Sequence, residues 1–169
     1  MRNQIKTVVA LVAICAVVAV MMALTNYITA PLIKENEEQA VNEALREVMP
    51  AGEGFEVIDI SSLSLPLTVV EAYREQGGGY VFKLNTTGYS SGMVIMCGVS
   101  ADGTVSGAVC LASTETLGYE KTYGDGMKGV SADSVDAVDV VSGATKTTAA
   151  YKGAVKDALL AFETLRGGK

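Results

Sequence analysis

The chain has 169 residues, 49% of them hydrophobic, and a net charge of −6 from 13 basic and 19 acidic residues. This length suits one domain with an accessory segment, and an acidic chain without a basic patch argues against nucleic acid as a partner. Histidine is absent, which excludes His-based triads, His-containing zinc sites and haem bound through His, and the three cysteines lack the spacing of a metal or iron–sulfur site.

An uncharged stretch near the start of the chain runs from Thr7 to Ile33. A bilayer core of about 30 Å needs roughly 20 apolar residues in a helix, so this stretch predicts one membrane span. Tyr27 lies where an aromatic residue is expected at the interface. Pro31 is expected to limit the helix.

The alternative to a retained membrane anchor is a cleaved signal peptide. Its apolar region is usually about 7–15 residues long and ends at a small-x-small site. The run here is longer and lacks a clear Ala-x-Ala site, which favours an anchor at 7–29 after a cytoplasmic tail at 1–6. The basic residues near the start slightly favour a cytoplasmic N-terminus. This orientation places the domain on the extracytoplasmic side of the cell membrane.

A connecting amphipathic helix is predicted at 30–50. Met49–Gly52 ends it, because this stretch contains a proline and a glycine. Residues near helical spacing form its apolar face: Ile33, Ala40, Val41, Ala44, Leu45 and Val48.

The remaining part, 51–169, is predicted to be one α+β domain with an antiparallel sheet flanked by helices. Residues typical of strands, separated by turn signals, predict strands at Phe55–Ile60, Leu67–Arg74, Tyr80–Asn85, Met93–Val99 and Thr104–Ala112. Asp102-Gly103 predicts a type I′ hairpin turn between the last two. In that register Cys97 and Cys110 lie diagonally on one face, where a disulfide is possible but not expected.

A long loop is predicted at Thr114–Ser134, and loops of this length are often functional. Its Gly-x-Gly-x-x-Gly at Gly124–Gly129 lacks the flanking strand and helix of a dinucleotide site. A final helix is predicted at Thr147–Arg166. Its apolar stripe comprises Tyr151, Val155, Ala158, Leu159, Phe162 and Leu165.

The segment Asp139–Thr148 before this helix has the composition of a phosphate site. A helix N-terminus favours anions, Gly143 allows close approach to the backbone, and Lys146 supplies a cation. Three hydroxyls lie within one turn, those of Thr145, Thr147 and Thr148. The alternative is a simple helix cap by Ser142 or Thr145, which the residues alone favour.

The sequence Asp-Val-Val-Ser-Gly-Ala-Thr at Asp139–Thr145 resembles the motif of proteins that carry covalently attached FMN. The resemblance implies that a flavin transferase joins the FMN phosphate to the hydroxyl of Thr145. It also implies that the transferase recognises the residues before it, namely Asp139, Ser142, Gly143 and Ala144.

The stretch Gly88–Gly118 is similar to the middle of the same family, in which a Gly-Tyr, two strands joined by an Asp-Gly turn and a Glu-Thr-x-Gly segment follow one another. The chain as a whole resembles the G subunit of the Rnf-type electron-transport complex, and the C subunit of the sodium-pumping NADH:quinone reductase is the related alternative. The resemblance implies flavin contacts from Glu115, Thr116, Leu117 and Gly118, although the proline usual in this segment is missing. Tyr119 and Tyr123 are either further contacts of the flavin ring or ordinary loop aromatics.

The resemblance implies an electron carrier without independent catalytic activity and without a metal. Its partners would be the other subunits of a membrane complex that couples electron transfer between ferredoxin and NAD to ion translocation. The alternatives are a membrane-anchored binding module without a cofactor and an FMN-binding protein outside such a complex.

Overall fold

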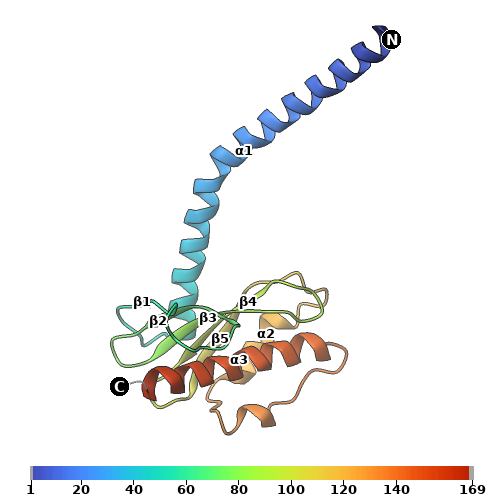
Figure 1. Ribbon diagram of the computed structural model, residues 1–169. Helices are drawn as coiled ribbons and strands as arrows, with labels where there is room; N and C mark the ends of the chain where they lie inside the picture. Colours follow the sequence, from blue (N-terminus) through green and yellow to red (C-terminus); the bar gives the residue numbers. More distant parts are fainter. Residues whose placement is uncertain (1, 168–169) are drawn as a thin grey trace. The chain divides into compact units, whose positions relative to one another are not determined.

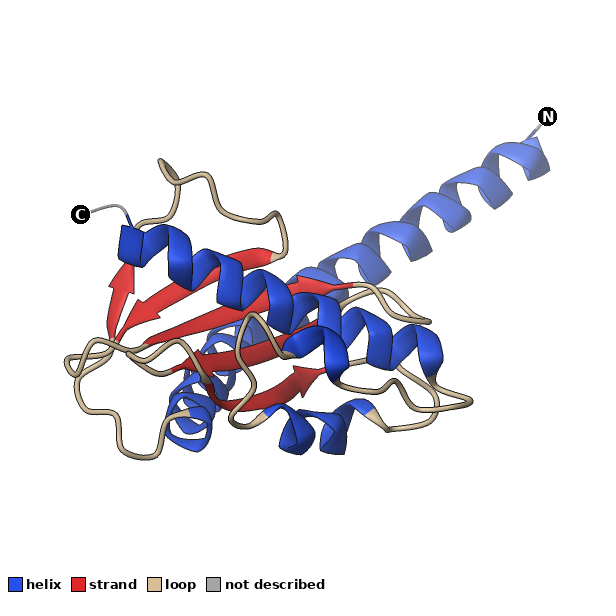
Figure 2. Cartoon of the chain, turned by 90° about the horizontal axis from the view of Figure 1, so that it is seen from below, coloured by secondary structure: helices blue, strands red, loops and turns tan. Residues whose placement is uncertain are grey.

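The computed structural model describes residues 2–167 and divides the chain into two compact units, Met1–Ala40 and Val41–Lys169. Helix α1 (Arg2–Val48) forms the described part of the first unit and ends in the second. The second unit is an α+β domain built on one antiparallel sheet, as predicted (Figures 1 and 2). The strands follow in chain order, β1 (Glu56–Ile58), β2 (Val69–Arg74), β3 (Tyr80–Thr86), β4 (Met93–Val99) and β5 (Val105–Ala112).

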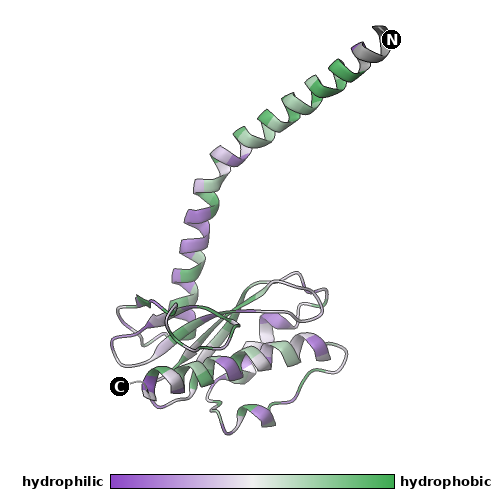
Figure 3. Ribbon diagram, viewed as in Figure 1, coloured by the Kyte–Doolittle hydropathy of each residue, from purple (hydrophilic) through white to green (hydrophobic). Residues whose placement is uncertain are grey.

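Helix α1 continues through Pro31, so the prediction that this proline limits the helix is wrong. A proline removes one backbone hydrogen bond, and the residues on both sides are helix-compatible, so the helix resumes beyond it. Its N-terminal part is hydrophobic and the part that follows is mixed, as Figure 3 shows. Among the described residues this helix is long and apolar enough to cross a membrane, with a mean hydropathy of 2.9 in its most apolar window.

Both faces of the sheet are covered. Helix α3 (Thr145–Gly167) packs on one face, where Phe82 and Ile95 are fully buried (Figure 2). The last turns of α1 cover the other face through Leu45 and Val48, against Met96 and its neighbours. Alternate residues of β4 therefore enter different cores, which explains why its sequence is a continuous apolar run.

The end of α1 lies directly on a pair of glycines in the sheet. Gly98 and Gly107 face each other across β4 and β5. A Cβ atom added to either would come within 2.9 Å of Val48 backbone atoms. The hydroxyl of Ser106 donates a hydrogen bond of 2.6 Å to the Val48 carbonyl. Glycine is needed at both positions because the helix end occupies the space that two side chains would fill.

The predicted apolar face of the connecting helix is buried only from Val41 onward, and Ile33 remains exposed. The predicted stripe of α3 is confirmed, because five of its six residues are buried and Leu165 is partly buried. The five strands are confirmed as elements, with β1 shorter than predicted.

The hairpin turn differs from the prediction. Only Gly103 has a positive φ, of 87°, whereas a type I′ turn needs two such residues. The connection is a three-residue loop closed by the hydrogen bond from the Ser100 N–H to the Thr104 carbonyl. Cys97 and Cys110 lie diagonally across β4 and β5 as predicted, and both are free thiols.

The predicted loop after β5 contains short helical turns. They are α2 (Glu120–Tyr123) and η1 (Gly124–Met127), and a further turn, η2 (Val135–Ala137), follows the loop. Gly124 packs against the sheet, because an added Cβ would overlap the Ala108 carbonyl oxygen. This close contact explains why the first position of the Gly-x-Gly-x-x-Gly pattern is a glycine: a larger residue would not fit against the sheet.

Replacing Gly107 by alanine is expected to lower the free energy of unfolding by about 1–3 kcal/mol, because the new methyl group would overlap Val48. Urea denaturation followed by circular dichroism measures this change. Gly153→Ala is the matched control, since an added Cβ there meets open space in α3, and alanine should stabilise the helix by up to about 1 kcal/mol. Equal effects of the two substitutions would contradict the proposed close packing.

Candidate functional site

A cavity of about 390 Å³ lies at the N-terminal end of α3. Three segments enclose it, the connection between β3 and β4, the segment from the end of β5 into α2, and the first turn of α3. Its lining residues are Tyr89, Glu115, Thr116, Leu117, Tyr119, Glu120, Gly143, Ala144, Thr145, Lys146 and Thr147. The structure thus brings together both predicted groups of site residues, except that Gly118, Ser142 and Asp139 do not line the cavity.

Helix α3 begins at Thr145, two residues earlier than predicted. Ala144 precedes it, and its carbonyl accepts the first helical hydrogen bond, from the N–H of Thr148. The prediction of a helix cap by Ser142 or Thr145 is therefore wrong, because Ala144 occupies the position before the helix and the Thr145 hydroxyl contacts only the Val141 carbonyl. The Thr148 hydroxyl instead accepts a hydrogen bond from the Val141 N–H at 3.1 Å and donates one to the Ala144 carbonyl at 3.0 Å.

The three threonines of this turn differ in what their hydroxyls do. Those of Thr147 and Thr148 are buried and hydrogen-bonded within the domain. Thr145 is exposed and lines the cavity, and its hydroxyl has only a long contact of 3.5 Å to the Val141 carbonyl. Of the three, Thr145 carries the hydroxyl that is accessible and least engaged in the fold.

Glu115 joins the three walls of the cavity. Its carboxylate accepts hydrogen bonds from the Thr147 hydroxyl at 2.5 Å and from the Ser90 N–H at 3.0 Å. Partial burial alone would raise the pKa of Glu115, but the bonds from Thr147, Ser90 and the Tyr89 backbone hold it below its ordinary value. Gly88 makes room for this arrangement, because an added Cβ would lie 2.5 Å from Glu115 Oε1.

Glu120 is a buried carboxyl residue of the cavity wall that the sequence did not indicate. It is 2% exposed, and its Oε1 accepts a hydrogen bond of 2.7 Å from the Ser113 hydroxyl. Its Oε2 is buried without a partner among the described residues. In the sequence Glu120 stands between Tyr119 and Lys121 in a polar loop, so no periodic pattern signals its burial.

The two candidate tyrosines have different positions. Tyr119 lines the cavity and is 42% exposed. Tyr123 instead packs edge-to-face on Tyr151 and donates a hydrogen bond of 2.9 Å to the Asp139 carbonyl. Tyr123 therefore holds the start of the Asp-x-x-Ser-Gly-Ala-Thr segment in place and does not line the cavity.

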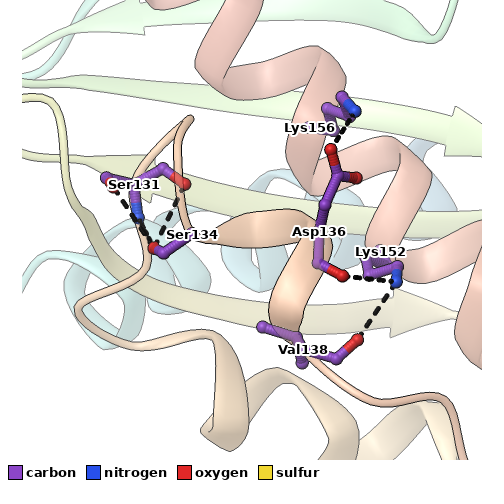
Figure 4. Close-up of polar contacts among 6 residues, drawn as sticks. All are labelled: Ser131, Ser134, Asp136, Val138, Lys152 and Lys156. Carbon is purple, nitrogen blue, oxygen red and sulfur yellow. Dashed lines mark hydrogen bonds and ion pairs between the residues drawn. The ribbon is translucent and has the colours of Figure 1, made fainter.

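Two lysines of α3 hold the chain before this segment, as Figure 4 shows. Lys156 forms an ion pair of 2.6 Å with Asp136 in η2. Lys152 donates to the carbonyls of Asp136 and Val138, the latter at 3.0 Å. The segment that leads into Thr145 is thus fixed to the same helix that Thr145 begins.

The chemistry of the cavity fits a phosphate-bearing aromatic ligand. Its volume lies within the roughly 300–1,000 Å³ of small-molecule sites. The first backbone N–H groups of a helix lack partners within the helix, and Lys146 adds a positive charge beside them. Tyr89, Tyr119 and Leu117 offer exposed apolar surface for a planar ring, and Glu120 offers an unpaired acceptor.

Gly143 has a φ of 85°, and an added Cβ there would meet open space. The glycine before the helix is therefore explained by backbone conformation, since left-handed φ values favour glycine.

Comparisons with known proteins match both units of the chain. Residues 88–160 match the family described as FMN-binding domain, and residues 1–48 match the RnfG N-terminal region. The chain is 32% identical to the G subunit of the Na⁺-translocating ferredoxin:NAD⁺ oxidoreductase complex of Acetobacterium woodii, over 79% of this chain and 72% of that protein. It is 28% identical to the G subunit of the ion-translocating oxidoreductase complex of Methanosarcina acetivorans, over 67% of this chain and 64% of that protein.

Thr147→Val is expected to lower the free energy of unfolding by about 1–3 kcal/mol, because it removes the donor that pairs with the Glu115 carboxylate. Thr145→Val should change stability by less than about 0.5 kcal/mol, since its hydroxyl makes only a long contact. Chemical denaturation of the two variants measures the difference. A loss in Thr145→Val as large as that in Thr147→Val would contradict the assigned roles.

The low pKa of Glu115 also predicts a pH dependence. Because the folded pKa lies below the ordinary value of 4.5, the contribution of this carboxylate is fully present above that pH and is lost as the pH falls through the folded pKa. The stability difference between wild type and Glu115→Gln should therefore shrink on acidification below about pH 4.5. Denaturation curves at neutral and acidic pH test this, and a difference independent of pH would refute it.

Proposed function

The chain belongs to the RnfG family, the G subunits of Rnf-type ion-translocating oxidoreductases, and on this basis we propose that it is the electron-carrier subunit of such a complex, with FMN phosphoester-linked to Thr145. The complex would couple electron transfer between ferredoxin and NAD to ion translocation, as the name of the Acetobacterium woodii relative states for that protein. The chain itself would carry electrons without a substrate site of its own.

The proposal of a covalent link rests on the accessibility of the Thr145 hydroxyl. The phosphoester would form when the Thr145 hydroxyl attacks the flavin-bearing phosphorus of a flavin dinucleotide and breaks its pyrophosphate bond, with the nucleoside monophosphate as the leaving group and the hydroxyl proton passing to a base. This step requires a hydroxyl that the transferase and its substrate can reach. Thr145 is exposed at the cavity, whereas the hydroxyls of Thr147 and Thr148 are buried and bonded to other groups. The flanking Asp139, Ser142 and Gly143 are also exposed, as a segment recognised by a transferase must be.

The residues around the cavity would bind and orient the cofactor. The first turn of α3 and Lys146 would neutralise the phosphate, and Tyr89, Leu117 and Tyr119 would contact the ring system. A bound FMN supplies one- and two-electron redox chemistry, which none of the side chains provides.

The N-terminal helix would anchor the protein among the membrane subunits of the complex. The proposed parts are a cytoplasmic tail at 1–6, a span at 7–29, a connecting helix at 30–50 and the FMN-binding domain at 51–169. The domain would lie on the extracytoplasmic side. A covalent link suits that location, because a dissociated flavin would be lost from the cell.

Thr145→Val is expected to abolish covalent flavin when the full chain is expressed together with a flavin transferase, because valine keeps the shape of threonine without the hydroxyl. In-gel flavin fluorescence after denaturation measures the link. Thr164→Val is the matched control, since Thr164 is an exposed threonine of the same helix that does not line the cavity, and it should keep the fluorescence. Flavin that is released from the wild type on denaturation would disprove the covalent link.

A further inference from the structure

One residue of the cavity wall has a carboxyl group that the fold satisfies only in part. Glu120 lines the cavity and is 2% exposed, yet only its Oε1 has a partner, the Ser113 hydroxyl. Its Oε2 is buried without a hydrogen bond among the described residues. Buried polar atoms are nearly always paired, and an unpaired carboxylate oxygen is among the costliest exceptions. Such an atom, in a residue that lines a cavity, is a candidate contact for a ligand bound there.

We propose that Glu120 is a further flavin-binding residue, whose Oε2 accepts a hydrogen bond from an N–H or O–H donor of the bound FMN. The inference rests on the proposed function, because it takes FMN as the occupant of the cavity. FMN offers two classes of donor, the imide N–H of its ring and the hydroxyls of its sugar chain. Either one would satisfy Oε2.

The Ser113 bond supports a positioning role for this carboxyl group. A serine hydroxyl that donates to Oε1 fixes the side chain from one side and leaves Oε2 as the free acceptor. Glu115, the other carboxylate of the cavity, already accepts from Thr147 and Ser90 within the fold. Of these two glutamates, Glu120 is therefore the one with a carboxyl oxygen that still lacks a hydrogen-bond donor.

The test uses Glu120→Gln in the full chain, purified in detergent after expression with and without the flavin transferase. Glutamine keeps the shape and the Ser113 bond, but it can place an NH₂ donor where the proposal needs an acceptor. The readout is the gain in melting temperature on flavin attachment, measured by calorimetry. Glu163→Gln is the matched control, because Glu163 is exposed near the C-terminal end of α3.

Wild type and Glu163→Gln should show the same gain in melting temperature, and Glu120→Gln should show less than half of it. Glu120→Asp, whose carboxylate is withdrawn by one methylene group, should show the same loss and provides a second variant. A purely structural role would lower the melting temperature equally with and without flavin and would leave the gain unchanged. An unchanged gain in the Glu120 variants, or no gain in a flavinylated wild type, would overturn the inference.

The midpoint potential of the flavinylated proteins identifies the donor. A shift of the potential in Glu120→Gln would assign the bond to the ring, since a hydrogen bond to the ring stabilises its oxidised and reduced forms unequally. An unchanged potential together with a reduced thermal gain would assign it to the sugar chain. Absence of in-gel fluorescence in the wild type would instead refute the proposed function, so the two failures are distinguishable.

Discussion

The cavity depends on one carboxylate. Glu115 follows β5, and its two oxygens accept hydrogen bonds from the loop between β3 and β4 and from the first turn of α3. These three segments are far apart in sequence, and each is a connection or an element end that would otherwise have few constraints. A charged acceptor with two donors forms stronger hydrogen bonds than neutral pairs, so this single group can fix the relative positions of all three walls.

The same arrangement separates the hydroxyls that stabilise the fold from the one that stays accessible. The hydroxyls of Thr147 and Thr148 stabilise the fold, one through Glu115 and the other through the backbone before the helix. Thr145 is left accessible because the helix begins at this residue and its side chain lines the cavity. A helix start and the proposed ligand site can coexist here because different side chains serve them.

The sequence predicted the strands, the final helix and the family with good accuracy, because the domain is rich in strong local signals. Alternating or continuous apolar runs and glycine-marked turns located every strand, and the motif at Asp139–Thr145 indicated the family. The errors concern backbone geometry that hydrophobic periodicity does not report. The helix begins earlier than its apolar stripe indicates because Thr148 bonds to the backbone preceding it.

Other parts of the site had no sequence signal. The burial of Glu120 depends on how the segment after β5 folds back onto the sheet, where Gly124 meets Ala108. A polar residue in a loop is normally exposed, so local rules place Glu120 in solvent. The prediction for Pro31 was wrong for a different reason, since the loss of one backbone hydrogen bond does not end a helix that is long on both sides.

The free hydroxyl of Thr145 has a consequence for biogenesis. The group that would receive the flavin is not needed to close the helix start, and the three walls of the cavity are joined by Glu115 without it. Folding and loading can therefore occur in sequence. A newly made domain would reach its final shape first and present a preformed acceptor, and a cell short of flavin would accumulate intact but colourless protein that awaits modification.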